Sequence, residues 1–106
     1  MMITPSSEIA GRAVVESLGL VRGNTIRTRH LGQDIMAVLR NLVGGEVREY
    51  TKMMAEAREQ AIDRMIEHAE ELGADAVVNV RFTTAYVMGS AAEILAYGDA
   101  VRLRAG

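Results

Sequence analysis

A long helical pattern that ends at a glycine and continues as a strand occupies the middle of the chain. Between Arg48 and Leu72 apolar residues recur every three or four positions, which is the spacing of one face of an α-helix. The residues of this apolar stripe are Met54, Ala57, Ala61, Met65, Ala69 and Leu72, widened by Ile62 and Ile66. Gly73 follows the stripe, where a helix commonly ends with a left-handed glycine. A helix of about 25 residues spans roughly 37 Å, and its single apolar stripe requires a sheet to cover it.

The segments on either side of this helix predict three strands and one shorter helix. The predicted strands, rich in β-branched or alternating residues, are Ala13–Arg22, Ala76–Tyr86 and Glu93–Leu103. Gly23-Asn24 is expected to form a turn, and Gly32–Val43 a short helix that ends at a glycine pair. The fold class predicted is α+β in the order β-α-α-β-β: an antiparallel three-stranded sheet with one long and one short helix on one face.

Strict alternation predicts which residues share a face of the last two strands. In the strand 76–86, Val78, Val80 and Phe82 share one face, and Asn79 and Arg81 lie on the other. In the last strand a face of small residues, including Ala96, Gly98 and Ala100, also carries Arg102. We expect this small face to point away from the helices and to contact another subunit, because small side chains allow a second backbone to approach closely.

Length and composition limit the class of protein. The 106 residues predict a single domain, 1–106. Only 4% of residues are aromatic and 15 are alanine, so the core is thin and contacts between subunits are expected to add burial. The net charge of −2 gives no signal for nucleic-acid binding. The absence of cysteine, of a leader pattern in Met1–Ala10 and of a long apolar segment predicts a cytoplasmic protein without membrane contact.

The chain lacks the residue patterns that metal binding and catalysis normally require. The two histidines, His30 and His68, do not occur in a paired-ligand spacing, and no thiolate is available. The serines and threonines have no motif of an activated nucleophile around them. We therefore predict no metal ligand, no catalytic residue and no cofactor.

Two groups of basic and polar residues are candidate anion-binding sites. Arg27 and Arg29 lie in the polar stretch Thr25–His30, which is either a solvated loop or edge strand, or the rim of an anion site if its arginines converge. Asn79, Arg81 and Arg102 are expected on the outer face of the sheet. That face is either ordinary solvent-exposed surface or an inter-subunit seam or channel. In a ring of subunits, one arginine per subunit becomes a ring of arginines.

Four parts of the chain carry a family resemblance: Gly19–Asn24, Val43–Gly45 followed by Tyr50, Gly73–Phe82 and Ala96–Val101. In these segments the chain resembles the YbjQ-like family. The resemblance covers about Ile3–Leu103, and Gly73–Phe82 is its most specific part. The resemblance implies a dodecin-like subunit assembled into a ring of five. The family is also labelled as heavy-metal-binding, so the resemblance brings this expectation with it. This chain departs from what the label needs, because it has no cysteine and only two scattered histidines.

Together these features predict a small cytoplasmic homo-oligomeric protein that binds a small ligand or ion at its subunit interfaces. The arginines favour a small anionic ligand. Self-association into a closed ring is expected, with five subunits implied by the family resemblance. A purely structural oligomeric scaffold and an enzyme with a composite inter-subunit active site remain alternatives.

Overall fold

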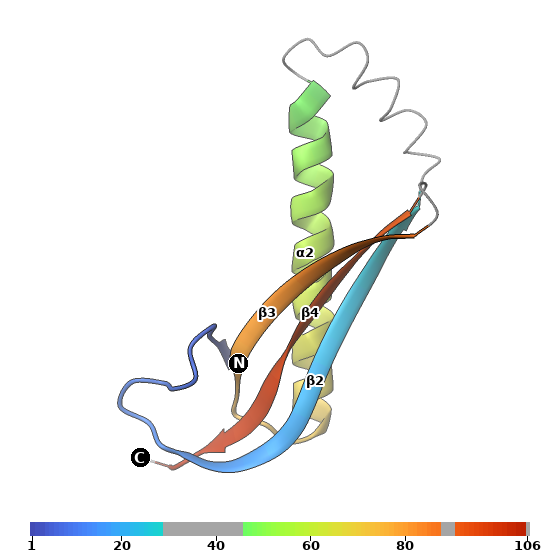
Figure 1. Cartoon of the computed structure of the whole chain (residues 1–106). Helices are drawn as coiled ribbons and strands as arrows, with labels where there is room; N and C mark the ends of the chain where they lie inside the picture. Colours follow the sequence, from blue (N-terminus) through green and yellow to red (C-terminus); the bar gives the residue numbers. More distant parts are fainter. Residues whose placement is uncertain (29–45, 88–90, 106) are drawn as a thin grey trace.

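The chain folds into a curved, twisted sheet with one long helix along one of its faces (Figure 1). The computed structural model describes residues 1–28, 46–87 and 91–105. The elements in chain order are β1 (Met2–Ile3), β2 (Val14–Thr28), α2 (Glu46–Glu71), β3 (Ala76–Val87) and β4 (Ala91–Leu103). Across the sheet the strand order is β1-β3-β4-β2. The β1–β3 pair is parallel, and the β3–β4 and β4–β2 pairs are antiparallel.

The predicted α+β class is confirmed, but the predicted three-stranded antiparallel sheet is wrong. Met2–Ile3 adds a fourth strand, which pairs in parallel with Ala76 and Val77 of β3. The chain stays on this edge beyond β1, because the N–H of Val80 donates to the carbonyl of Thr4 at 3.0 Å. A strand of two residues carries almost no alternation, so the pattern could not reveal it. Helix α2 is the one helix of the described residues, and the predicted short helix Gly32–Val43 lies outside them.

The long helix and its end agree with the prediction. On the apolar stripe of α2, Ala57, Ala61, Met65 and Ala69 are fully buried. Gly73 adopts φ +78° and ends the helix. Its N–H donates to the carbonyl of Glu70 at 3.0 Å, and the N–H of Ala74 donates to that of Ala69 at 3.0 Å. These two bonds form a Schellman motif, which satisfies carbonyls that a helix end would otherwise leave unpaired.

Strand β2 continues through the residues that were predicted to form a turn. Gly23 and Asn24 pair with Ala96 and Leu95 of β4. Gly23 lies under the helix: a Cβ at this position would overlap the carbonyl oxygen of Ala61 and the backbone nitrogen of Met65. The glycine is therefore needed for space inside a strand and not for a turn. Its absent side chain allows α2 to lie with its backbone directly on β2.

The small face of β4 is part of the core, so the prediction that it contacts another subunit is wrong. Ile94, Ala96 and Ala100 are buried in one cluster with the apolar stripe of α2. Gly98 packs within the same sheet, because a Cβ there would lie 2.7 Å from a methyl group of Val77 on β3. Helix α2 carries mostly alanine on its buried stripe and approaches the sheet closely. The strand beneath it consequently carries small residues as well.

A β-bulge at Asn79 changes the predicted faces of β3. Asn79 adopts φ +56°, and the pairing with β4 shifts between Val78 and Arg81. Val77 and Val80 therefore both join the cluster beneath α2. Val78 lies on the opposite face, in a second cluster that also contains Ile9, Ala76, Val101 and Leu103. The extra residue of the bulge breaks the period of two on which the prediction depended.

The chain is elongated. Its principal extents are 55 × 25 × 16 Å and its Cα radius of gyration is 17.2 Å, whereas a globular domain of this length has a radius of about 13 Å. Within the described ranges, α2 is too polar to cross a membrane, and there is no other helix there that could do so.

The contact at Gly23 gives a direct test of this helix packing. Gly23→Ala is expected to lower the free energy of unfolding by about 3 kcal/mol, because the obstructing atoms belong to the helix backbone and cannot rotate away. Asn24→Ala is the control on the next residue, which is exposed, and should cost less than about 1 kcal/mol. Urea denaturation of both variants measures the difference. Equal costs would contradict the close contact.

Candidate anion-binding site

Three side chains form a row across the face of the sheet that is turned away from α2, here called the outer face. Tyr97 on β4 pairs with Arg22 on β2 and with Arg81 on β3. Residues paired across antiparallel strands point to the same face. The flanking Val21 and Gly23 face the helix, so Arg22 points outward. Because neighbouring strands lie about 4.8 Å apart, the two arginines stand roughly 10 Å apart at the backbone, with Tyr97 between them.

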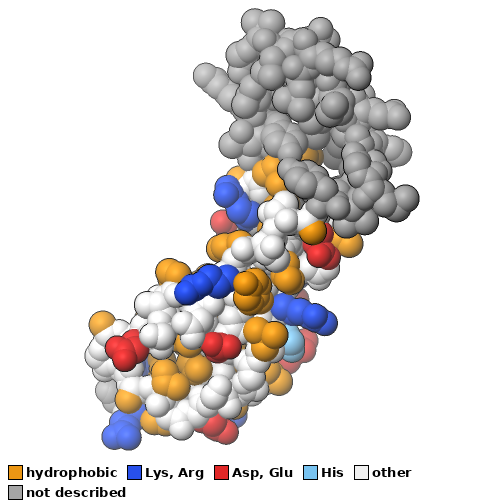
Figure 2. All heavy atoms as spheres, viewed as in Figure 1, with side chains coloured by type: hydrophobic (Ala, Val, Ile, Leu, Met, Phe, Trp, Pro, Cys, Tyr) orange, Lys and Arg blue, Asp and Glu red, His pale blue; other side chains and the backbone are white. Residues whose placement is uncertain are grey.

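The two arginines of this row are not neutralised by described residues. Arg81 is held by its Nη1 group, which donates to the carbonyls of Pro5 at 2.7 Å and Val80 at 2.9 Å. Arg22 is exposed. In the part of the chain that the structure describes, neither forms an ion pair with a carboxylate. Basic side chains flank a hydrophobic group across the middle of the surface in Figure 2.

Among the described residues, the carboxylate nearest the row is Asp99, whereas Glu93 lies farther along β4 and accepts a hydrogen bond from Nδ2 of Asn24 at 3.1 Å. Asp99 is two residues from Tyr97 on β4, and its Oδ2 accepts a hydrogen bond from the Nδ2 group of Asn79 at 2.9 Å. The bulge places the Asn79 amide at this position, so a neutral donor and not an arginine holds Asp99. Arg22, Arg81 and Asp99 together carry a net charge of +1. This charge, with guanidinium N–H groups as donors, suits a small oxyanion or carboxylate.

The structure brings together some of the site residues predicted from the sequence and separates others. Asn79 and Arg81 both lie on β3, where Arg81 pairs with Tyr97 and Asn79 donates to Asp99. Arg27 is part of β2 and pairs with Ala92, but its side chain lies outside the described part, and Arg29 lies outside the described residues altogether. The expectation that Arg102 shares the outer face is wrong, as its contacts at the helix end demonstrate.

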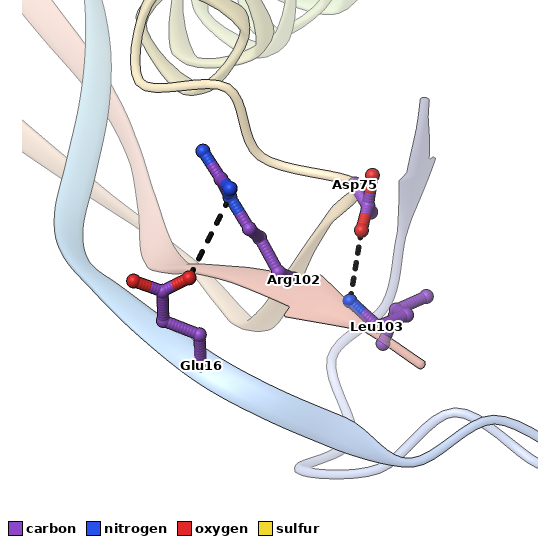
Figure 3. A network of polar contacts seen from close by, with 4 residues as sticks. All are labelled: Glu16, Asp75, Arg102 and Leu103. Carbon is purple, nitrogen blue, oxygen red and sulfur yellow. Dashed lines mark hydrogen bonds and ion pairs between the residues drawn. The ribbon is translucent and has the colours of Figure 1, made fainter. Parts of the chain in front are cut away.

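Arg102 belongs to a group of residues that joins the end of α2 to the sheet (Figure 3). Its Nε lies 3.7 Å from Oε1 of Glu16, and its guanidinium lies against Gly73, at the helix C-terminus. In the same region Oδ2 of Asp75 accepts the N–H of Leu103 at 2.9 Å, and the N–H of Asp75 donates to the carbonyl of Val101 at 2.9 Å. These contacts attach the turn that joins α2 and β3 to the neighbouring strand, β4. The segment after Gly73 therefore has a structural role.

Sequence reasoning missed Arg22 and Tyr97 as members of the site. The predicted first strand ended at Arg22, so the face on which this arginine lies was never assigned. Once Gly23 is known to be a strand residue, alternation places Arg22 with Leu20, Asn24 and Ile26 on the outer face. The signal in the sequence was a glycine in the middle of a segment in which outward-facing and inward-facing residues alternate.

Comparison with known proteins places the chain in a family. A family model described as "Putative heavy-metal-binding", YbjQ, matches residues 1–104. The chain belongs to the YbjQ family. It is 62% identical to a UPF0145 protein of Halorubrum lacusprofundi, covering 98% of this chain and 100% of the relative. It is also 59% identical to a UPF0145 protein of Methanosarcina acetivorans, with 97% of each chain covered.

A solved structure has the same fold. The crystal structure of a protein of unknown function from Pediococcus pentosaceus, assigned to the DUF74 family, aligns with a TM-score of 0.65 over 98% of both chains. Only 17% of the aligned residues are identical, so this likeness extends to the fold alone.

The described residues do not fit a heavy-metal site of the kind that the YbjQ family description names. Within residues 1–28, 46–87 and 91–105, no three side chains of His, Cys, Asp or Glu come together. The whole chain lacks cysteine. Nδ1 of His68 already accepts the backbone N–H of Arg22 at 3.3 Å. A soft metal ion prefers thiolate and imidazole ligands, which this donor set does not supply together.

We therefore expect no tight zinc or copper binding at one equivalent per subunit. The measurement is a calorimetric titration of the metal-free protein with Zn²⁺ and with Cu²⁺, followed by dialysis and metal analysis. A His30→Ala/His68→Ala double variant is the control, and it should behave as the parent does. Stoichiometric submicromolar binding that survives dialysis would contradict this expectation.

Proposed function

We propose that this YbjQ-family chain assembles into a closed cyclic homo-oligomer that binds a small oxyanion or carboxylate at its subunit interfaces. The observation that carries the proposal is the outer-face row, in which Arg22 and Arg81 flank Tyr97 without a carboxylate partner among the described residues. The guanidinium of Arg22, and the N–H groups of Arg81 that are not bonded to Pro5 and Val80, supply charge and planar donors to one ligand.

The shape and the outer face of the subunit support the assembly. With a radius of gyration of 17.2 Å, the chain exposes a large surface relative to the size of its core. On the outer face Leu20 and Ile26 are 61% and 54% exposed. A neighbouring copy that covers this face would bury these side chains and lower the dielectric around the arginines, which strengthens their attraction for an anion. The number of subunits, five, is the number that the family resemblance implies.

A small anion suits this surface better than a nucleic acid. The chain carries a net charge of −2, so it lacks the broad basic surface that tracks a phosphate backbone. The row supplies two arginines around one tyrosine, which matches the size of a phosphate or a small carboxylic acid.

Anion titration of charge variants tests the site. Inorganic phosphate titrated into the wild-type protein at low ionic strength should give saturable binding. Arg22→Gln and Arg81→Gln should each weaken the binding about tenfold, because each removes charge-assisted hydrogen bonds to the ligand. Arg58→Gln is the matched control: it removes the same charge from an exposed position of α2 and should leave the affinity unchanged.

The same samples report on assembly through light scattering coupled to size exclusion. The wild-type protein and all three variants should elute as one oligomer of constant mass. A monomeric wild-type protein would contradict the assembly. An equal loss of phosphate affinity in all three variants, Arg58→Gln included, would contradict the site.

A further inference from the structure

The sheet has two edges, and the chain protects only part of each. An edge strand presents unpaired backbone N–H and C=O groups, which can pair with another strand. Strand β2 forms one edge, and the short β1 together with the remainder of β3 forms the other. The location of the protected and unprotected parts follows from the hydrogen bonds on each edge.

Helix α2 protects the edge of β2 as far as Asn24. The backbone N–H of Arg22 donates to Nδ1 of His68 at 3.3 Å, and Nη1 of Arg64 donates to the carbonyl of Asn24. Arg64 and His68 lie one helical turn apart, so both reach the same edge. Alternate residues of a strand direct their backbone groups to the same side. The next groups on this edge are therefore those of Ile26 and Thr28, for which the described residues supply no partner.

The N-terminal arm protects the opposite edge as far as Val80. The N–H of Val80 donates to the carbonyl of Thr4, and its own carbonyl accepts Nη1 of Arg81 at 2.9 Å. By the same alternation, the backbone groups of Phe82 and Thr84 face outward on this edge, and the sheet has no further described strand beside them.

The unprotected part of β3 lacks the features that normally prevent strand addition. The run Phe82–Ala85 is exposed and contains no charged residue and no proline. Phe82 is 47% exposed, although it pairs with Ala96 and so lies on the helix side of the sheet. Helix α2 packs mainly on β2 and β4, and leaves this part of β3 uncovered.

The two unprotected edges lie level with each other at the same end of the sheet. Ala85 of β3 and Ile26 of β2 both pair with Glu93 of β4. Both strands are antiparallel to β4, so they run in the same direction. We propose that residues Phe82–Ala85 of one subunit pair with residues Ile26–Thr28 of the next subunit, which continues the sheet from copy to copy. The occupant of each edge is a second copy of this chain, because the chain itself supplies the matching edge.

This pairing rests on the proposed assembly and adds to it a contact at the sheet edges, beside the contact on the outer face. It joins two different surfaces head to tail, which is the kind of contact that closes a ring. It also satisfies backbone groups on both edges and removes an exposed strand that would otherwise invite uncontrolled pairing.

Proline substitution tests the pairing, because it removes one outward N–H without removing a bond to β4. Thr84→Pro and Ile26→Pro each take away a donor on one unprotected edge. Both variants should retain the wild-type circular dichroism and lose the oligomer in light scattering coupled to size exclusion. Thr84→Val and Ile26→Val keep the N–H groups and should assemble as the wild type does.

The outcomes distinguish this pairing from the proposed function. A monomeric wild-type protein overturns the assembly itself. A wild-type oligomer whose two proline variants are folded and still assembled overturns only the edge pairing. Loss of assembly in Thr84→Pro alone overturns the head-to-tail arrangement, because β3 would then contact something other than β2.

Cysteine crosslinking provides an answer even if a proline variant does not fold. The chain contains no cysteine, so introduced thiols react only with each other. Ile26→Cys combined with Thr83→Cys or with Ala85→Cys places both thiols on the outer face. Oxidation of at least one of these double variants should give a ladder of linked subunits on a non-reducing gel, and the single variants should give none. Absence of the ladder from both double variants overturns the pairing.

Discussion

The contact between the backbone of α2 and Gly23 determines the rest of this structure. Without a side chain at Gly23, the helix lies directly on β2, and the atoms that it meets are those of Ala61 and Met65. So close an approach requires small residues on both elements. Alanine therefore fills much of the buried stripe of α2 and the facing part of β4. The small residues on this face of β4 are a consequence of the close approach between α2 and the sheet.

A core of small residues stabilises the folded chain only modestly, because hydrophobic stabilisation increases with the apolar area that is buried. The outer face is covered only in part. Ile9 of the N-terminal arm packs there with Val78, Val101 and Leu103. Beyond this cluster lie Leu20, Ile26 and the row of Arg22, Tyr97 and Arg81. Among the described residues, the arm and the helix thus protect the sheet edges at one end of the chain, and the proposed contacts with further copies use the edges at the other end.

The parts of the fold that depend on local periodicity could be predicted from the sequence. The stripe of α2 and the stop at Gly73 follow from a 3.6-residue period and from the conformational freedom of glycine. The predictions from the sequence were wrong where tertiary contacts determine the local structure. Gly23 serves the helix packed above it, the Asn79 bulge shifts the alternation of β3 by one residue, and β1 is too short to show a pattern. The positions of Asn79 and Arg81 on a strand could be predicted, whereas the face of Arg22 could not, because the predicted first strand ends at this residue.

The concentration dependence of thermal unfolding tests most directly whether the subunit depends on other copies for its stability. Association that accompanies folding makes the unfolding midpoint rise with protein concentration. The midpoint is therefore expected to rise steadily as the subunit concentration increases about a hundredfold from the low micromolar range. A midpoint that stays constant over this range would contradict the dependence, because it would mean that the thin core stabilises the subunit alone.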